Sequence, residues 1–467
     1  MPAATDRFQV LSPVNGRVVA ERALADARAL DAALEAASRA RSGWQSTPLE
    51  ERISLLHALV EAFLASGESI ADELTAQMGR PRRFSPGEVA GFADRARTML
   101  ELAPAALADV VPPHKDGFRR LVRRAPLGVV LVLAPWNYPY LTAVNAVVPA
   151  LAAGNVVLLK HSDQTPLCAE RMVQAGREAG LPPGVFEFIH MSHDLTAAAV
   201  RDPRVDHVAF TGSVGGGHAV VRAASDRFIG MGLELGGKDP AYVRPDADVA
   251  FAAENVIEGA LFNSGQSCCA VERVYVHEAI WEEFVERAVS AAEGWRLGLP
   301  EDPDTLLGPV VRPRNAEVIQ AQVDAALKAG AWGLVDPGAF AEGRALGPGF
   351  MAPQLLVEVT HDMEIMREET FGPVAGIMKV SSDDEAIRLM NDSRYGLTAS
   401  LWTRDADAAM RLGSRLETGT VFMNRCDYLD PFLAWTGVKD SGRGCTLSAV
   451  GYEHLTRPRS FHLRLRN

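Results

Sequence analysis

Apolar residues recur at helical spacing from Ala23 to about Val110, in a stretch rich in Ala, Leu and Glu. Leu55, Leu56, Leu59, Val60 and Phe63 show this periodicity. It is typical of amphipathic helices, so this stretch is predicted to form a helical layer and no part of a functional site. Before it, two short alternating runs within 8–19 flank Asn15-Gly16, which predicts a β-hairpin.

From Gly128 onward, short apolar runs alternate with helical patterns. The runs cover 128–134, 155–160, 185–190 and 207–210. Such alternation predicts a doubly wound parallel sheet, whose ligands bind at the carboxyl ends of the strands. After Glu234 the pattern repeats, with a strand at 273–276, a helix at 280–295 and further units to about 423, which predicts a second α/β domain.

One apolar span, 141–159, is long enough to suggest a membrane helix. It is interrupted by Asn145, Pro149, Gly154 and Asn155, which favours a helix, a turn and then a strand. Residues 1–10 contain no apolar core of a secretory signal. The sequence therefore predicts a protein that is not associated with a membrane and that is located in the cytoplasm.

Charge and cysteine content narrow the function classes. The formal net charge of −12 argues against a nucleic-acid partner, since such binding relies on clustered Lys and Arg. The basic run Arg119–Arg124 alternates enough to be an edge strand whose charges discourage aggregation. Five cysteines without a CxxC pair or clustered His predict neither a disulfide framework nor a metal site, and they fit a reducing compartment.

Two adjacent cysteines, Cys268 and Cys269, follow Gly265-Gln266 and precede a strand-like run at 271–276. A cysteine on a loop of small residues can ionise when backbone N–H groups or a cation stabilise the thiolate, which is the nucleophilic form. The alternative is a small buried hydrophobic residue, and most intracellular cysteines are of that kind.

This stretch is one of four motifs that occur in a recognisable order. They are Pro135-Trp136-Asn137-Tyr138-Pro139, Glu234-Leu235-Gly236-Gly237-Lys238, Phe262-Asn263-Ser264-Gly265-Gln266-Ser267-Cys268-Cys269 and Glu368-Glu369-Thr370-Phe371-Gly372-Pro373-Val374. In their order, and in the spacing between Glu234 and Cys268, they resemble the aldehyde dehydrogenase superfamily over nearly the whole chain. The resemblance implies oxidation of an aldehyde to its acid with NAD or NADP.

The resemblance also implies catalytic roles. Cys268 would be the nucleophile, Asn137 a donor to the oxyanion, and Glu234 the base that activates water, with Cys269 a bystander. The CoA-acylating branch typically lacks this Glu, so Glu234 favours hydrolysis. Two alternatives stay open: a CoA-acylating semialdehyde dehydrogenase, and a catalytically silent structural member of the family. Lys238 is interpreted as structural or solvated.

A cofactor site is expected where strands end. Thr211 to Gly217 is a glycine-rich turn opening a helix, suited to an anion, although it does not form GxGxxG. By resemblance, NAD, or NADP in its place, contacts residues of this turn and of three other segments: Gly212, Ser213, Gly217, Lys160, Asp163, Trp136, Leu235, Glu369 and Phe371. His161 and Asp163 stand where the family has Pro and Glu, and Asp163 could instead cap the next helix.

A substrate pocket is expected beside the helix that begins near Pro139. Tyr138, Thr142 and Asn145 share one of its faces, and by resemblance that face lines the tunnel together with Asp427, Tyr428 and Trp435. This polar lining favours a polar or hydroxylated aldehyde, unless Asn145 only satisfies a backbone group. Near the C-terminus the chain departs from the family, with Cys445 and Thr446 where Arg and Glu are common.

The predicted fold is α/β, with two doubly wound parallel-sheet, Rossmann-like domains and a small β bridging element. The NAD(P)-binding domain is expected to span 1–107 and 127–236, and the catalytic domain 237–440. By resemblance, the bridging strands lie within 108–126 and 456–467 and join subunits into a homodimer or homotetramer.

Overall fold

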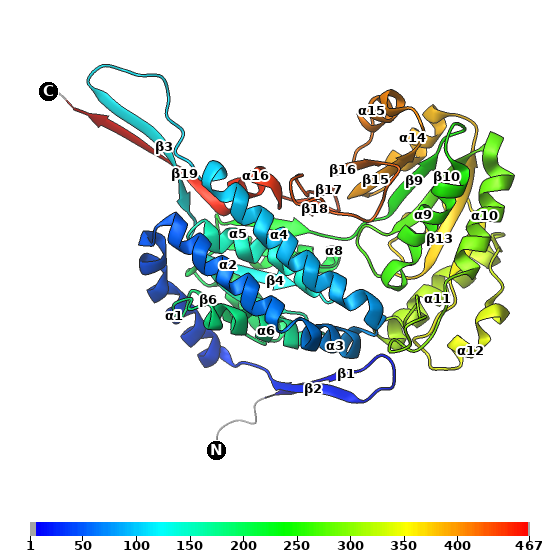
Figure 1. Cartoon of the computed structure of the whole chain (residues 1–467), viewed down its shortest axis with the longest axis horizontal. Helices are drawn as coiled ribbons and strands as arrows, with labels where there is room; N and C mark the ends of the chain where they lie inside the picture. Colours follow the sequence, from blue (N-terminus) through cyan, green and yellow to red (C-terminus); the bar gives the residue numbers. More distant parts are fainter. Residues whose placement is uncertain (1–5, 466–467) are drawn as a thin grey trace.

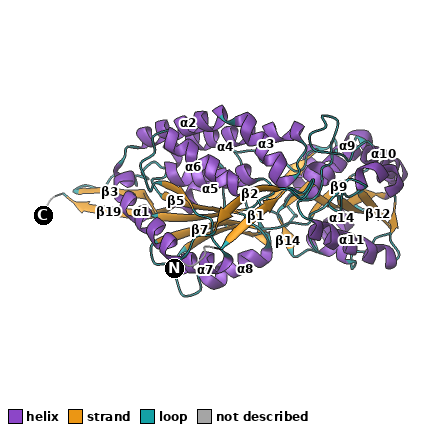
Figure 2. Cartoon of the chain, turned by 90° about the horizontal axis from the view of Figure 1, so that it is seen from below, coloured by secondary structure: helices purple, strands orange, loops and turns teal. Residues whose placement is uncertain are grey.

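The computed structural model describes residues 6–465. The chain forms two lobes, each built around a sheet, and a two-stranded arm projects from the first lobe (Figure 1). In both lobes helices lie above and below the strands (Figure 2). The two sheets are mostly parallel and their strands alternate with helices, which confirms the α/β fold predicted from the sequence.

The first sheet has six strands. In spatial order they are β18 (Gly442–Arg443), β8 (Gly230–Glu234), β7 (Val205–Thr211), β4 (Val129–Ala134), β5 (Val156–His161) and β6 (Phe186–Phe188). All pairings are parallel except that of β18 with β8. Every residue of β4 and β5 is buried, as expected for central strands covered on both faces.

Eight helices accompany this sheet. They are α1 (Ala27–Ser46), α2 (Leu49–Ala65), α3 (Gly67–Met78), α4 (Ser85–Ala106), α5 (Pro139–Ala152), α6 (Pro166–Glu178), α7 (His193–Arg201) and α8 (Val214–Ala223). The first four form the predicted helical layer. Figure 2 shows α2 to α6 on one side of the strands and α7 and α8 on the other. α5 begins at a proline, which suits the first helical position.

The second sheet has seven strands. In spatial order they are β11 (Trp332–Gly333), β12 (Gln354–Val357), β13 (Val374–Val380), β10 (Val271–His277), β9 (Asp239–Val243), β15 (Thr398–Trp402) and β16 (Thr420–Met423). Only β11 runs antiparallel to its neighbour. The helices of this lobe are α9 (Val249–Leu261), α10 (Trp281–Glu293), α11 (Pro313–Lys328), α12 (Ala341–Arg344), α13 (Glu364–Arg367), α14 (Asp383–Asn391) and α15 (Ala406–Gly413).

Two small sheets match segments that the sequence singled out. β1 (Arg7–Leu11) and β2 (Val18–Ala23) form the predicted hairpin. β3 (Phe118–Pro126) pairs antiparallel with β19 (Thr456–Arg464), and together they form the arm at the upper left of Figure 1. Residues 466 and 467 of the predicted bridging segment, and 1–5 of the predicted first domain, lie outside the described residues. The domain boundaries and the role of the arm in assembly stay predictions.

The remaining elements are short. They are η1 (Arg82–Phe84), η2 (Phe262–Gly265), η3 (Glu278–Ile280), η4 (Pro337–Phe340), η5 (Tyr452–Leu455), α16 (Ser448–Gly451), and the paired strands β14 (Tyr395–Gly396) and β17 (Val438–Lys439). Between residues 6 and 465, no single helix is long and apolar enough to cross a membrane; α2 and α3 would meet that test only jointly, across a 67° bend.

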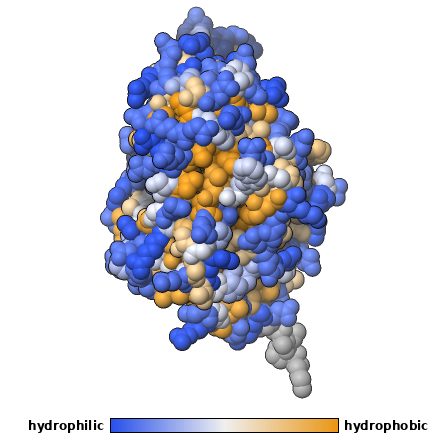
Figure 3. All heavy atoms as spheres, turned by 90° about the vertical axis from the view of Figure 1, so that its right-hand side faces the viewer, coloured by the Kyte–Doolittle hydropathy of each residue, from blue (hydrophilic) through white to orange (hydrophobic). Residues whose placement is uncertain are grey.

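The surface of the second lobe is mixed. Figure 3 shows its outer face, where hydrophobic residues gather near the centre and hydrophilic residues surround them. Much of any protein surface is apolar, so this area by itself identifies no partner.

Candidate active site

A cavity of about 670 Å³ brings the predicted catalytic and substrate residues together. Its walls come from α4, α5, α9, the carboxyl ends of β7 and β8, the Cys268 loop and the loop after β16. Cys268 and Glu234 both line it. The cavity therefore lies at the carboxyl edge of the first sheet, where a doubly wound fold is expected to bind ligands.

The loop that carries Cys268 is held in an unusual backbone conformation. Asn263 and Ser264 have positive φ angles of 53° and 58°, and Gly265 has φ of 69°. A Cβ atom at Gly265 would come within 2.0 Å of the Gly372 carbonyl oxygen, so only glycine fits there. The side chain of Gln266 accepts a hydrogen bond from the Val311 N–H at 2.8 Å. These constraints present Cys268, which is partly exposed, to the cavity.

Cys269 points to a different environment. It is 3% exposed, and its Sγ donates to Oδ1 of Asp427 at 3.0 Å, where the Ser267 hydroxyl also donates at 2.8 Å. A hydrogen bond with Cys268 and burial raise the pKa of the Cys269 thiol. Burial also raises the pKa of Asp427, to about 6. A thiol held in its protonated form is a poor nucleophile, which agrees with the bystander interpretation.

Glu234 ends β8 and is held by two hydroxyl groups. Thr211 Oγ1 donates to its Oε2 at 3.1 Å, and Thr446 Oγ1 donates to its Oε1 at 2.5 Å. Burial raises the pKa of this carboxyl above its usual value, which brings it nearer to the range that suits a general base at neutral pH. From the sequence, Thr446 was recognised only as a departure from the family pattern, and no role was predicted for it. Its contact with Glu234 depends on the antiparallel pairing of β18 with β8.

Asn137 is buried beside the Cys268 loop. Its Nδ2 donates to the Gln266 carbonyl at 3.2 Å, and its own carbonyl accepts from Arg80 Nη2 at 2.5 Å. An amide nitrogen carries two hydrogens, so one remains for another acceptor. The part of the cavity wall formed by described residues does not include Asn137. The structure thus brings Asn137 next to the nucleophile's loop, and its role as an oxyanion donor stays a prediction.

The predicted pyrophosphate turn is the amino end of α8. Ser213 is the N-cap, and its Oγ accepts from the Gly216 N–H at 3.2 Å. A Cβ at Gly217 would meet the Leu235 side chain at 2.8 Å, so glycine allows α8 to pack against Leu235. Gly212 and Ser213 are at least partly exposed. Free N–H groups at a helix start favour an anion, so this turn fits a dinucleotide pyrophosphate.

The predicted ribose contacts follow β5. Lys160 Nζ lies 3.2 Å from Asp163 Oδ1. The N-cap of α6 is Thr165, and Asp163 makes no side-chain hydrogen bond to this helix start, so the alternative that Asp163 caps α6 is wrong. The pair lies at the carboxyl edge of the same sheet as the α8 turn, which fits a ligand extending along that edge.

The predicted nicotinamide contacts Glu369 and Phe371 lie in the loop before β13, and Trp136, another predicted cofactor contact, follows β4. Trp136 and Phe371 meet edge to face with their ring centroids 5.6 Å apart. Glu369 Oε1 accepts from the Gly237 N–H at 3.0 Å. Burial and the nearby Glu272 raise the pKa of Glu369 to about 8.

Glu272 fixes this loop, and the sequence analysis missed it. It accepts hydrogen bonds from the N–H groups of Thr370 and Phe371 at 2.8 and 2.9 Å. It also forms a buried ion pair with Lys238 at 2.5 Å. Lys238 is therefore structural, in agreement with the prediction.

All six predicted substrate residues line the cavity: Tyr138, Thr142, Asn145, Asp427, Tyr428 and Trp435. Asn145 Oδ1 accepts from Arg95 Nη1 at 3.4 Å rather than satisfying a backbone group. The Tyr138 hydroxyl is buried without a hydrogen-bond partner among residues 6–465. Such a group can bind a substrate atom.

The helical layer contributes to this site, contrary to the sequence-based expectation. Arg80, Glu88 and Arg95 all line the cavity. Helical periodicity indicates which positions are buried, but it does not show whether a buried residue packs in the core or lines a cavity. These three polar residues occupy buried positions of α4 and of the turn before it, so the expectation was wrong.

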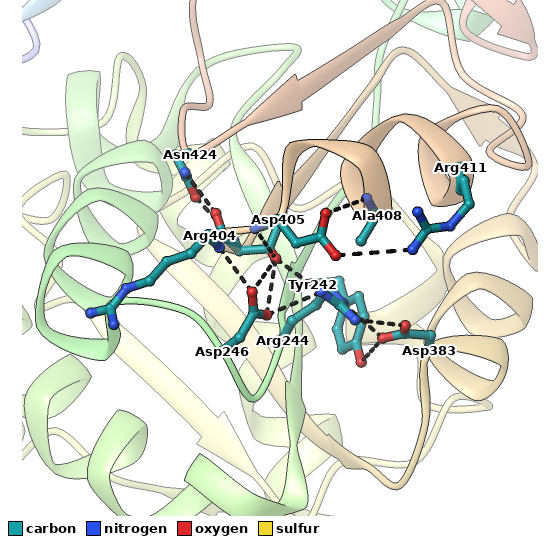
Figure 4. Close-up of polar contacts among 10 residues, drawn as sticks. Tyr242, Arg244, Asp246, Asp383, Arg404, Asp405, Ala408, Arg411 and Asn424 are labelled. Carbon is teal, nitrogen blue, oxygen red and sulfur yellow. Dashed lines mark hydrogen bonds and ion pairs between the residues drawn. The ribbon is translucent and has the colours of Figure 1, made fainter.

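The loop after β16 is anchored to the second lobe. Asn424 exchanges two hydrogen bonds with the backbone of Thr403, at 3.0 and 2.8 Å. The Thr403 hydroxyl donates to Asp246, which also pairs with Arg244 at 3.1 Å (Figure 4). These hydrogen bonds hold the first residue of the cavity-lining loop, Asn424, in place.

Comparisons with known proteins agree with this site. The sequence model of the aldehyde dehydrogenase family matches residues 1–461. The mitochondrial aldehyde dehydrogenase of Leishmania tarentolae is 35% identical over 474 residues, which cover 100% of this chain and 94% of that protein. The succinate semialdehyde dehydrogenase Sad of Escherichia coli K12, named for NAD(P)+, is 34% identical over 441 residues, 94% of each chain.

A solved structure extends the likeness to three dimensions. The NADP-dependent glyceraldehyde-3-phosphate dehydrogenase from Bacillus halodurans C-125, in complex with NADP, superimposes with a TM-score of 0.93 at 32% identity, covering 99% of this chain and 96% of that one. Family, fold and relatives therefore agree: this chain belongs to the aldehyde dehydrogenase family and oxidises aldehydes to acids with NAD or NADP.

Proposed function

We propose that Cys268 is the nucleophile and Glu234 the deacylating base of a hydrolytic enzyme for short polar aldehydes. One observation supports the proposal above others: both side chains line one cavity, and two threonine hydroxyls hold Glu234. A carboxylate and a partly exposed thiol that line the same cavity are the two groups that thioester hydrolysis needs.

In the first half of the cycle, the Cys268 thiolate attacks the aldehyde carbon, and the negative charge moves to oxygen. The remaining amide hydrogen of Asn137 donates to that oxygen, and a donor of this kind stabilises the transition state by roughly 3 kcal/mol. The nicotinamide, when bound, supplies the acceptor for the hydride that leaves the substrate carbon. Cys268 then carries the acyl group as a thioester.

In the second half, Glu234 takes a proton from a water molecule, and the resulting hydroxide attacks the thioester carbon. The carbon–sulfur bond breaks, the acid leaves, and Cys268 regains its thiolate. Thr211 and Thr446 keep the carboxylate oriented during this step. The elevated pKa of Glu234 makes it a stronger base than an exposed glutamate.

The cofactor is held by this chain's own groups along one sheet edge. The amino end of α8 would hold the pyrophosphate, Lys160 and Asp163 would hold the adenosine ribose, and Phe371 with Trp136 would contact the nicotinamide end. We infer a preference for NAD, because the Asp163 carboxylate accepts from a ribose hydroxyl and repels a 2′-phosphate.

The substrate class follows from the polar part of the cavity. The Tyr138 hydroxyl has no partner among residues 6–465, so an alkyl chain would leave its hydrogen bond unmet. Thr142 and Asn145 add polar groups to the lining, although the first donates to the Tyr138 carbonyl and the second accepts from Arg95. The relative Sad is named for succinate semialdehyde, a short aldehyde with a polar end. Both points support short, polar aldehydes.

Assembly into a dimer or tetramer is inferred from the arm. β3 and β19 project from the first lobe, and Leu463 in β19 is an exposed apolar side chain. An apolar residue on a projecting ribbon favours contact with a second subunit. Light scattering on the purified chain gives the mass directly, and a monomer at micromolar concentration argues against the inference.

The test of the catalytic assignment separates the two halves of the cycle. Reduced cofactor is followed after rapid mixing at enzyme concentrations high enough to count sites. Glu234→Gln is expected to give one burst per site, with steady turnover lowered roughly 100-fold or more. Cys268→Ala should give neither phase.

Cys269→Ala is the matched control and should keep both phases. Mass spectrometry should find the acyl adduct of Glu234→Gln on Cys268. A burst that survives in Cys268→Ala, or an adduct on Cys269, rules out the nucleophile assignment. Normal turnover of Glu234→Gln would move the base to another residue, with Glu369 the next to test.

A further inference from the structure

Arg95 of α4 is a buried cation in the cavity wall that has no carboxylate partner. It is 9% exposed, and its Nη1 donates to the Leu141 carbonyl at 2.7 Å and to Asn145 Oδ1 at 3.4 Å. None of the ion pairs within residues 6–465 includes it. Nε and Nη2 make no hydrogen bond to any described residue, they are not among the fully buried atoms that lack a partner, and the residue lines the cavity.

Arg80, the other buried arginine of the cavity, is fully compensated. It forms an ion pair with Glu88, and it donates to Asn263 Oδ1 at 3.1 Å and to the Asn137 carbonyl at 2.5 Å. Its guanidinium thus fixes the Cys268 loop and leaves little for a ligand. The contrast identifies Arg95 as the buried cation whose donors remain available.

An uncompensated charge in this position is costly. Burial lowers the pKa of the Arg95 guanidinium, and the nearby Glu234 carboxyl opposes that shift. Arginine stays protonated even so, because its pKa begins far above neutrality. A buried cation is normally paired, so a missing partner points to a ligand that brings the negative charge.

We propose that Arg95 binds a carboxylate at the far end of the substrate, which makes short aldehydes with a terminal carboxylate the substrate class of this enzyme. This deepens the proposed function and rests on it, since the aldehyde end must lie at Cys268. The fork of N–H groups on a guanidinium matches a planar carboxylate.

Other charged side chains of the cavity also act on a bound anion. Glu88 is paired with Arg80, Glu234 accepts hydrogen bonds from two threonines, and Arg425 adds an exposed cation. Asp94 and Glu258, which also line the cavity, are exposed and therefore screened by water. Asp427 is deeper, but its Oδ1 is occupied by Ser267 and Cys269. A carboxylate that meets the desolvated Arg95 is therefore opposed mainly by groups that are screened by water or already hydrogen-bonded.

The test compares 4-oxobutanoate with its neutral methyl ester and with butanal, each with NAD, in the parent and three variants. The parent should prefer the acid. Arg95→Met should lower kcat/KM for the acid roughly 10- to 100-fold, mainly through KM, and leave the neutral substrates near their parent values. Arg95→Lys should give a kcat/KM for the acid between those of the parent and Arg95→Met, because lysine keeps the positive charge but loses the forked N–H groups of the guanidinium.

Arg97→Met is the matched control, because Arg97 lies on the same helix, is exposed and pairs with Glu61 at 2.6 Å. It should leave the acid-to-ester ratio unchanged. The parent's own ratio tests the proposal even if Arg95→Met does not fold, and equal kcat/KM for acid and ester overturns it.

A second readout separates substrate binding from an effect on the active-site thiol. The pH dependence of Cys268 alkylation is measured in the parent and in Arg95→Met. If Arg95→Met lowers kcat/KM equally for all three substrates and shifts the pH profile of Cys268 alkylation, then Arg95 acts on the thiol. That result overturns the proposal. Failure of the proposed function looks different, since then Cys268→Ala would still oxidise butanal.

Discussion

The hydroxyl of Thr446 donates to Glu234 Oε1 at 2.5 Å across 212 positions of sequence. A hydrogen bond to the ionised form lowers the pKa of a carboxyl, so Thr446 opposes the effect of burial on Glu234. The Thr446 hydroxyl thereby favours the ionised form of Glu234, the proposed deacylating base.

Thr446→Val is predicted to raise the pKa of Glu234 further and to shift the acidic limb of the kcat profile to higher pH. Loss of one hydrogen bond to a charged group should lower kcat at pH 7 roughly 10-fold, with recovery as the pH rises. The measurement is kcat from pH 6 to 9. Thr446→Ser keeps the hydroxyl and should follow the parent. An acidic limb that stays in place in Thr446→Val contradicts this role.

Asp163→Ala is predicted to narrow the preference for NAD over NADP. The substitution removes the carboxylate that repels a 2′-phosphate and leaves Lys160, its partner at 3.2 Å, free to bind one. A gain of roughly 10-fold in kcat/KM for NADP is expected, since placing like charges together is costly. Asp163→Glu serves as the control that keeps the charge. Equal use of both cofactors by the parent protein would refute the preference.

Glu369 is predicted to make the folded protein less stable as the pH rises. Its pKa is about 8 in the folded chain against 4.5 for the free group, so between these values the folded state holds a proton that the unfolded state has released. Its stabilising contribution is therefore complete below about pH 4.5 and is lost as the pH rises to about 8.

Glu369→Gln removes this titration, so its Tm should fall less than the parent's between pH 5.5 and 8.5. Glu368→Gln, at the exposed neighbouring position, should behave like the parent. Parallel Tm curves for the parent and Glu369→Gln would show that Glu369 is ionised at neutral pH.

Short hydroxylated or carboxylated aldehydes are predicted to outcompete long alkanals and aromatic aldehydes. An apolar substrate leaves the Tyr138 hydroxyl without a partner, which costs binding energy. A panel of aldehydes at fixed NAD, scored by kcat/KM, tests this. A clear preference for decanal or benzaldehyde is the result that the polar cavity does not allow.

The fold could be predicted from the sequence because buried parallel strands leave a strong pattern. The runs at 128–134 and 155–160 correspond to β4 and β5, whose residues are all buried. The six predicted substrate residues line one cavity, and they were predicted because three share a helix face and because all occupy positions that resemble the family's tunnel. These are local signals.

Arg95, Glu272 and Thr446 were missed for the opposite reason. Arg95 lies within a helical pattern that indicates packing alone, and Glu272 lies within a strand. Thr446 reaches Glu234 only through the pairing of β18 with β8. Which distant residues meet a catalytic group depends on tertiary contacts, and a single sequence does not display them.

The pairing of β18 with β8 also orders events in time. Both β18 and Thr446 follow nearly the whole first lobe and all of the second-lobe sheet in the chain. During synthesis on a ribosome, the proposed nucleophile Cys268 therefore emerges before Thr446, which holds the proposed base Glu234. A nascent or shortened chain that stops before β18 would contain Cys268 and Glu234 without the hydroxyl that steadies the carboxylate. We expect Cys268 of such a chain to become acylated and the acid to be released slowly. Full hydrolytic turnover would then require β18, the last strand of the first sheet, to be in place.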